Sequence, residues 1–445
     1  MLDFSLILQL IVFLGAIFIG IRLGGIAIGY SGGLGVVILG LFLGMKPGNI
    51  PWDVILIIAA AIAAISAMQQ AGGLDYMVRI TEKVLRANPK FINYLAPACG
   101  WLLTVLAGTG NAVFSLMPVV IDVAKSQNIK PSAPLSLMVV SSQIGITASP
   151  VSAAVVYMSG VLEPLGWHYP VLIGIWIVTT FIACMLTAFI VSHITPLDLS
   201  KDPVYQERLK AGLVKDAGEI LHSKDKPGAK LSVAIFLITV LCVVFYATAI
   251  SDNIKLISPV IVKRDEAIMS FLLTAAALIT WFCKVEPAKI LDTSVFKSGM
   301  TACVCVFGVA WLGNTFVAGH EQSIKDLAGQ WVKDYPAMLA VAFFFASMLL
   351  YSQAATAKAI TPIILTALGI SATNPSDSYM LVACFAAVSA LFVLPTYPTL
   401  LGAVQMDDTG STRIGKFIFN HAFFIPGVLA IAISVALGFA IAPLL

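Results

Sequence analysis

The chain has 445 residues, of which 59% are apolar and only 11% are charged. A soluble domain carries about 25% charged residues, so this composition excludes an ordinary water-soluble protein and predicts one membrane domain in contact with the lipid bilayer. The net charge of +3 is small and gives no reason to expect binding to nucleic acid.

Three apolar stretches open the chain, at 4–21, 25–44 and 51–70. The hydrocarbon core of a bilayer is about 30 Å thick and requires roughly 20 residues of helix, so each stretch is predicted to be a transmembrane span. The chain begins Met-Leu-Asp, without a basic leader or an evident small-residue cleavage site. We therefore expect a retained first helix and not a signal peptide.

A longer apolar segment at 92–124 is interrupted by a polar stretch near its middle. Its length and its interruption predict a re-entrant hairpin, with a tip formed by Gly108, Thr109, Gly110 and Asn111. Glycine permits a tight turn, and the helix that follows presents unpaired N–H groups and its positive dipole end to an anion. A turn whose polar groups are satisfied internally, without a ligand, is the structural alternative.

The next predicted span, 131–162, contains the run QIGITASPVSA. Proline removes a helical N–H group and obstructs the preceding turn, so we expect a broken helix at this point. Its polar side chains satisfy the freed carbonyl groups or bind a ligand; they belong to Gln143, Thr147, Ser149 and Ser152. A simple proline kink without binding is the alternative.

A fifth span is predicted at 168–192, and the longest polar stretch of the chain, 195–229, follows it. The mixed charges and the Pro and Gly content of this stretch are typical of a solvated linker that includes a surface helix. Apolar spans then resume at 230–250, 264–282 and 294–318.

A second interrupted segment, 335–368, predicts a second re-entrant hairpin with the tip sequence Ser352-Gln353-Ala354-Ala355-Thr356. Lys358 follows this tip and is the one basic residue that the predicted topology leaves inside the membrane. A charge there is costly and usually functional. Lys358 is expected to bind a substrate carboxylate or to replace a coupling cation; an ion pair with an acid, or snorkelling to the surface, is the alternative.

The last two spans are predicted at 376–405 and 418–443. The first of them contains LPTYPT, in which two prolines three residues apart predict a broken helix near Thr396 and Thr399. Interruptions at corresponding places in two halves of a membrane protein indicate a transport site.

The order of elements repeats along the chain. One constant offset maps the first hairpin onto the second and the broken span 131–162 onto 376–405. Each half has five spans and one hairpin that does not cross, and five is odd, so the second half enters the membrane from the opposite side. This predicts an all-α membrane protein with an inverted repeat, residues 1–194 and 230–445, a plan typical of secondary transporters. The quasi-periodic hydropathy of any membrane protein is the alternative explanation.

Most Lys and Arg residues outside the spans, including those of the linker 195–229, collect on one predicted face. The positive-inside rule assigns that face to the cytoplasm. Ten spans return the chain to its starting side, so both termini are expected to be periplasmic.

The chemistry of the tips favours an anion, because helix N-termini, hydroxyl groups and one lysine lie there without an evident buried acid. The seven cysteines form no CxxC pair, and His320-Glu321 is not continued as HExxH. We therefore expect no metal site, no cofactor and no enzymatic activity. A channel remains the other rival, although no filter-like repeat is present.

The chain resembles the Dcu family of anaerobic C4-dicarboxylate transporters. The motifs that carry the resemblance lie in order across the whole chain: GGIAIGYSGGLGVVILG at 24–40, GGLD at 72–75, GTGN at 108–111, SSQIGITASPVSAAVV at 141–156, FGVAWLGNTF at 307–316 and LPTYPT at 394–399. The resemblance implies exchange of fumarate, malate, aspartate and succinate across a bacterial inner membrane, chiefly fumarate for succinate during anaerobic respiration.

The wider ion-transporter superfamily implies two opposed hairpins and an elevator-type movement. On that analogy, one half of the substrate site is formed by Thr109, Gly110, Asn111, Ser149 and Ser152. The other half is formed by Ser352, Gln353, Thr356, Thr396 and Thr399. The second tip departs from a Ser-Asn-Thr-like pattern, which favours antiport over sodium symport. A sodium- or proton-coupled symporter of citrate or a monocarboxylate, an amino-acid carrier and a homodimeric state are left open.

Overall fold

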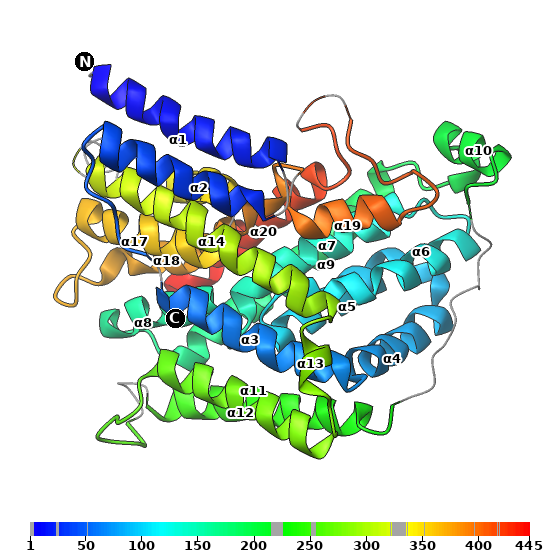
Figure 1. Ribbon diagram of the computed structural model, residues 1–445, viewed down its shortest axis with the longest axis horizontal. Helices are drawn as coiled ribbons and strands as arrows, with labels where there is room; N and C mark the ends of the chain where they lie inside the picture. Colours follow the sequence, from blue (N-terminus) through cyan, green and yellow to red (C-terminus); the bar gives the residue numbers. More distant parts are fainter. Residues whose placement is uncertain are drawn as a thin grey trace.

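The computed structural model describes residues 4–23, 26–50, 52–214, 226–250, 255–320, 322, 335, 337–350, 352–395, 397–415, 417 and 419–445. These residues are almost entirely helical (Figure 1), and their only β-pairing is three isolated bridges. Seven helices of the described part are long and apolar enough to cross a membrane, or up to eight if a bent pair is one span. The expected all-α membrane protein is confirmed.

The described residues of the first half form nine α-helices. The first four are α1 (Phe4–Leu23), α2 (Ala27–Val37), α3 (Trp52–Gln70) and α4 (Gly73–Ala87). The next five are α5 (Ile92–Ala107), α6 (Met117–Ser126), α7 (Ser132–Gly145), α8 (Ala153–Leu162) and α9 (Tyr169–Ile194). A 3-10 turn, η3 (Gly110–Ser115), connects α5 to α6, and the break between α7 and α8 lies at the predicted proline.

The second half follows the short helix α10 (Pro203–Lys210). Its described helices are α11 (Ala229–Ala249), α12 (Arg264–Phe282), α13 (Pro287–Ile290), α14 (Ser294–Gly319), α16 (Met338–Leu350), α17 (Gln353–Leu368), α18 (Tyr379–Cys384), α19 (Pro398–Met406) and α20 (Phe424–Ile441). The predicted span 376–405 is divided into α18, the 3-10 segment η8 (Phe385–Phe392) and α19. It is therefore broken, as LPTYPT predicts.

The packing of these helices repeats between the halves. α2 packs along α14, and in the same way α12 packs along α3. α5 packs on α7, and α16 packs on η8. The first two contacts join the two halves and the last two lie within one half each, so segments that the constant offset relates make corresponding contacts.

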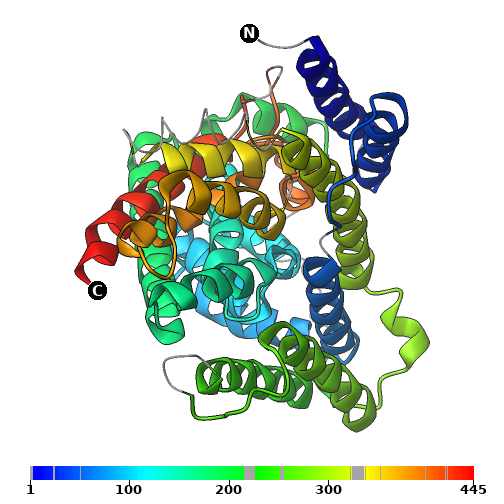
Figure 2. The same cartoon turned by 90° about the vertical axis from the view of Figure 1, so that its left-hand side faces the viewer.

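The helices separate into two sets that touch each other sparsely. The outer helices are α1–α4, α11, α12 and α14, and the core helices are α5–α9 and α16–α20. Figure 2 shows α1, α2, α3 and α14 along the right side and α11 and α12 at the bottom of the view, around the core helices. The largest cluster of buried apolar side chains lies mainly in the core helices.

The start of the linker is attached to the core helices by ionic contacts. Asp202 caps α10 and lies 3.1 Å from the Lys130 ammonium group and 3.7 Å from the Arg413 guanidinium group. Burial alone would raise the pKa of Asp202, but the Lys130 hydrogen bond and the Tyr205 N–H group hold it below its usual value. The Arg208 side chain also donates to the carbonyl oxygen of Asp408 at 2.8 Å.

Candidate functional site

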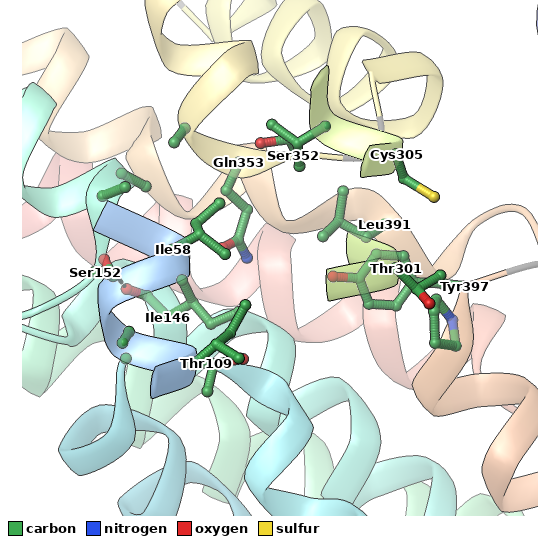
Figure 3. Close-up of a pocket in the computed structure, with 18 of the residues that line it drawn as sticks. Ile58, Thr109, Ile146, Ser152, Thr301, Cys305, Ser352, Gln353, Leu391 and Tyr397 are labelled. Atoms are coloured by element: carbon green, nitrogen blue, oxygen red, sulfur yellow. Dashed lines mark hydrogen bonds between the residues drawn. The ribbon is translucent and has the colours of Figure 1, made fainter. Parts of the chain in front are cut away.

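A cavity of about 410 Å³ lies where the two halves meet (Figure 3). Both hairpin tips and both broken helices contribute to its wall. The core residues that line it include Gly108, Thr109, Phe114, Ile146, Ser152, Ala153, Ala154, Ser352, Gln353, Ala354, Leu391, Tyr397, Pro398, Leu401, Gly402 and Gln405. The outer helices close it with Ile28, Ile58, Ala61, Ile62, Thr301, Cys305 and Val306.

Two helices begin at this cavity with a serine cap. The Ser152 hydroxyl accepts a hydrogen bond from the Val155 N–H group at 3.2 Å at the start of α8. The Ser352 hydroxyl accepts one from the Ala355 N–H group, also at 3.2 Å, at the start of α17. The other first-turn N–H groups of a helix have no partner within that helix. Both α8 and α17 therefore direct donors and a positive dipole end to the cavity.

The first hairpin tip lies on the same wall. Gly108 has a φ of +71°, and a Cβ atom there would lie only 2.8 Å from Val151 Cγ2, so both its conformation and its surroundings require glycine. Thr109 lines the cavity beside it. Gly110 does not line the cavity and lies against the carboxamide of Gln143. The side chain of Asn111 lies outside the described part of the structure.

Behind the wall, buried polar groups connect the two halves. The Gln143 carboxamide donates to the Thr399 hydroxyl at 3.0 Å, and the Gln143 carbonyl accepts from the Gln353 carboxamide at 2.6 Å. Gln353 also donates to the Ser389 hydroxyl at 3.0 Å. Thr399 is therefore near the cavity without lining it.

Two more predicted site residues support the wall instead of forming it. The Ser149 hydroxyl donates to the Val105 carbonyl at 2.6 Å, which ties the break between α7 and α8 to the first hairpin. The Thr356 hydroxyl donates to the Ser352 carbonyl at 2.7 Å, within the first turn of α17. Thr396 lies outside the described residues.

Lys358 does not line the cavity. Its ammonium group forms an ion pair with Asp53 near the start of α3 and lies 5.4 Å from the centre of the Tyr157 ring. Its side chain is 17% exposed and that of Asp53 is 42% exposed. The structure thus shows the alternative arrangement, in which the charge of Lys358 is paired with an acid. The expected contact with a substrate carboxylate has no support in this geometry.

Several lining residues were not predicted from the sequence. Tyr397, Gln405 and Phe114 come from the core helices and the first hairpin, and Thr301 and Cys305 come from α14. Tyr397 was within reach of sequence reasoning, because it directly precedes the helix that LPTYPT predicts, whereas Gln405 lies near the far end of that helix. Thr301 and Cys305 lie in an ordinary apolar span, where no sequence signal distinguishes them.

The described wall of the cavity contains no Asp, Glu, Lys, Arg or His. The described residues also hold no cluster of three or more potential metal ligands. Hydroxyl groups, carboxamides and helix N-termini are the polar groups that this part of the chain presents to the cavity. Such a site can bind a small anion through neutral donors and helix dipoles.

Comparison with known proteins identifies relatives along the full length of the chain. Residues 5–445 match the model of the anaerobic C4-dicarboxylate membrane transporter family. The C4-dicarboxylate transporter DcuA of Wolinella succinogenes is 62% identical over 99% of this chain and 100% of its own length. DcuA of Escherichia coli K12 is 54% identical over 98% of each chain. These relatives are named as transporters, which agrees with the expectation that the chain is not an enzyme.

The fold has a solved counterpart. The crystal structure of the Alcanivorax borkumensis YdaH transporter matches with a TM-score of 0.53 and covers 92% of this chain and 88% of that chain. The two sequences are 13% identical, so this likeness concerns the fold alone. The family is established by the sequence matches: the chain belongs to the anaerobic C4-dicarboxylate membrane transporters.

Proposed function

We propose that the protein exchanges C4-dicarboxylates, namely fumarate, malate, aspartate and succinate, across a bacterial inner membrane, chiefly fumarate against succinate. The observation that carries this proposal is the pair of serine-capped helix N-termini, at Ser152 and Ser352, in one cavity without charged side chains on its described wall. Relatives with 54% and 62% identity are named C4-dicarboxylate transporters.

Each substrate carboxylate would be bound by one of these N-termini. The N–H groups of Ala153 and Ala154 belong to the first turn of α8, and those of Gln353 and Ala354 belong to the first turn of α17. Thr109 adds a hydroxyl group from the first hairpin tip. Because the donors come from two separate helices, a molecule with two carboxylates uses both of them, whereas a monocarboxylate uses one.

Helix N-termini bring only partial positive charge to the site, so they do not neutralise the two charges of a bound dicarboxylate. A dianion that moves alone would carry its two charges through the membrane potential, at about 2.3 kcal/mol per charge per 100 mV. When a second dianion is carried in the opposite direction, no net charge crosses the membrane and that cost is cancelled. We therefore propose antiport, in agreement with the departure of the second hairpin tip from a sodium-site pattern.

We further propose that the core helices move relative to the outer helices, so that the cavity faces each side of the membrane in turn. The repeats would be residues 1–194 and 230–445. Among the described residues, three ion pairs cross between the two sets and would break during the movement: Asp53–Lys358, Arg86–Asp122 and Arg264–Glu163. The linker would lie in the cytoplasm and both termini in the periplasm.

The test is an exchange assay with the purified protein in liposomes. Vesicles loaded with succinate should take up labelled fumarate, and removing the internal dicarboxylate should slow the uptake at least tenfold. Equal uptake into empty vesicles under a sodium or proton gradient would establish symport and contradict the exchange proposal.

The site itself is tested by removing the two caps. Ser152→Ala and Ser352→Ala should each raise the KM for fumarate about tenfold, since each removes a hydroxyl from the cavity and loosens a helix N-terminus. Thr293→Ala is the matched control, because Thr293 caps α14 through the Phe296 N–H group and does not line the cavity. A rise in KM as large in the control as in the serine variants would remove the serines from the site.

A further inference from the structure

We infer that the side chain of Gln143 is the positioning group that holds the second-half helix α19 in register with the first hairpin, beside the backbone contact that the same residue makes with α17. This inference rests on the proposed function and deepens it, because it concerns how the donors of the substrate site are kept in place. Gln143 is fully buried, two residues before the end of α7, and does not itself line the cavity.

One residue contacts three elements that build the cavity. The Gln143 backbone carbonyl accepts from Gln353, the first residue of α17. The side chain of Gln143 donates to Thr399, in the first turn of α19. A Cβ atom on Gly110 would lie 3.0 Å from Gln143 Nε2, so the hairpin tip also rests against this carboxamide.

The contacts on α17 and α19 fix the ends of those helices that face the substrate. Gln353 lines the cavity, and so does Pro398, the residue before Thr399. A shift of either helix N-terminus moves its N–H groups relative to a bound carboxylate. Because Gln353 also bonds Ser389, the carbonyl of Gln143 belongs to a network that includes the second broken helix.

The side chain of Gln143 is buried, and among the described residues one of its two polar atoms is unsatisfied. Within the described part of the chain, its Oε1 atom is buried and has no hydrogen-bond partner. An unsatisfied buried acceptor is unfavourable, and native proteins tolerate few of them. A leucine of similar size would avoid that loss, so a role in packing alone does not account for glutamine here. The bond to Thr399 does.

The test compares Gln143→Leu, Thr399→Val and the double variant in the exchange assay. Each single substitution should raise the KM for fumarate about tenfold with little change in kcat, since each removes the same hydrogen bond. The double variant should be no worse than the singles, because the two changes act on one interaction. Gln9→Leu replaces another buried glutamine, in α1, and should leave KM unchanged.

A binding measurement separates positioning from general stability. Succinate should raise the Tm of the wild type and of Gln9→Leu, and should raise that of Gln143→Leu much less. If Gln143→Leu does not fold, Thr399→Val and Gln143→Asn supply the same comparison. An unchanged KM in these variants, or additive losses in the double variant, would overturn the inference. Absence of exchange by the wild type would instead contradict the proposed function.

Discussion

Lys358 is the residue at which sequence and structure differ most in what they suggest. The sequence places a lone charge in the membrane, where a functional role is the default. The structure supplies its partner, Asp53, from the outer helix α3, and a ring contact with Tyr157. The charge therefore connects the core helices to the outer helices near the cavity without facing the cavity.

Paired substitutions distinguish an ion pair from a substrate contact. Lys358→Met and Asp53→Asn should each lower the free energy of unfolding by about 1 kcal/mol, because the pair is only partly buried. The double variant should lose no more than either single one, and the KM for fumarate should stay within about twofold of the wild type. Thermal unfolding and the exchange assay measure both quantities. A large rise in KM confined to Lys358→Met would instead indicate that Lys358 contacts the substrate.

The residues that the sequence places on the cavity wall share one property. Thr109, Ser152, Ser352 and Gln353 lie at breaks in long apolar segments, and a break in a membrane helix is visible from composition and from proline. Gln143 and Thr399 also lie at predicted breaks, but the hydrogen bond between them is not visible in this way. Gln143 and Thr399 are joined across the two halves, and no local pattern specifies a contact between such distant positions.

At the scale of elements, uniform apolar spans were predictable almost to the residue. The prediction for 264–282 matches α12, and that for 168–192 matches α9 within two residues. Crossing the bilayer requires about 20 apolar residues, so such uninterrupted spans stand out from the sequence. The sequence did not predict that α3 turns by 75° into α4, or that α2 continues as a π-helical turn over Ile38–Phe42. Such local departures depend on packing against neighbouring helices.

The ion pairs between the outer and core helices offer a direct test of movement between these elements. Arg264 at the start of α12 lies 2.5 Å from Glu163 at the end of α8 and also donates to Ser159. The exposed fractions of these side chains are 11% and 7%. Removing one partner would leave a buried charge, so both are replaced together.

The variant Arg264→Gln/Glu163→Gln should change the exchange rate several-fold while its preference among dicarboxylates stays that of the wild type. We expect a faster rate, because a contact that holds one state is lost before the core helices move. Lys125→Gln/Asp408→Asn is the control, since Lys125 lies 3.0 Å from Asp408 and both belong to the core side. Equal effects of the two double variants on the rate would argue against relative movement of the two sets.

At the scale of the whole molecule, basic side chains gather where the linker joins the core helices. Lys130 and Arg413 surround Asp202, and Arg208 contacts the carbonyl of Asp408. These residues come from both repeats and from the linker, and the sequence-based topology assigns all of them to one face. Their proximity agrees with that topology, and under the orientation proposed above this face is the cytoplasmic one.

Tags in the linker and after Leu445 test this orientation. Between them lies the second repeat, with an odd number of predicted crossings, so the two tags should lie on opposite sides of the membrane. The C-terminal tag should react with antibody or protease in spheroplasts, and a tag inserted after Gly212 should react only in inverted vesicles. Retained fumarate exchange would show that each tagged protein is correctly folded. Reaction of both tags from the same side would mean that the second half crosses an even number of times, and an inverted repeat could then not be maintained.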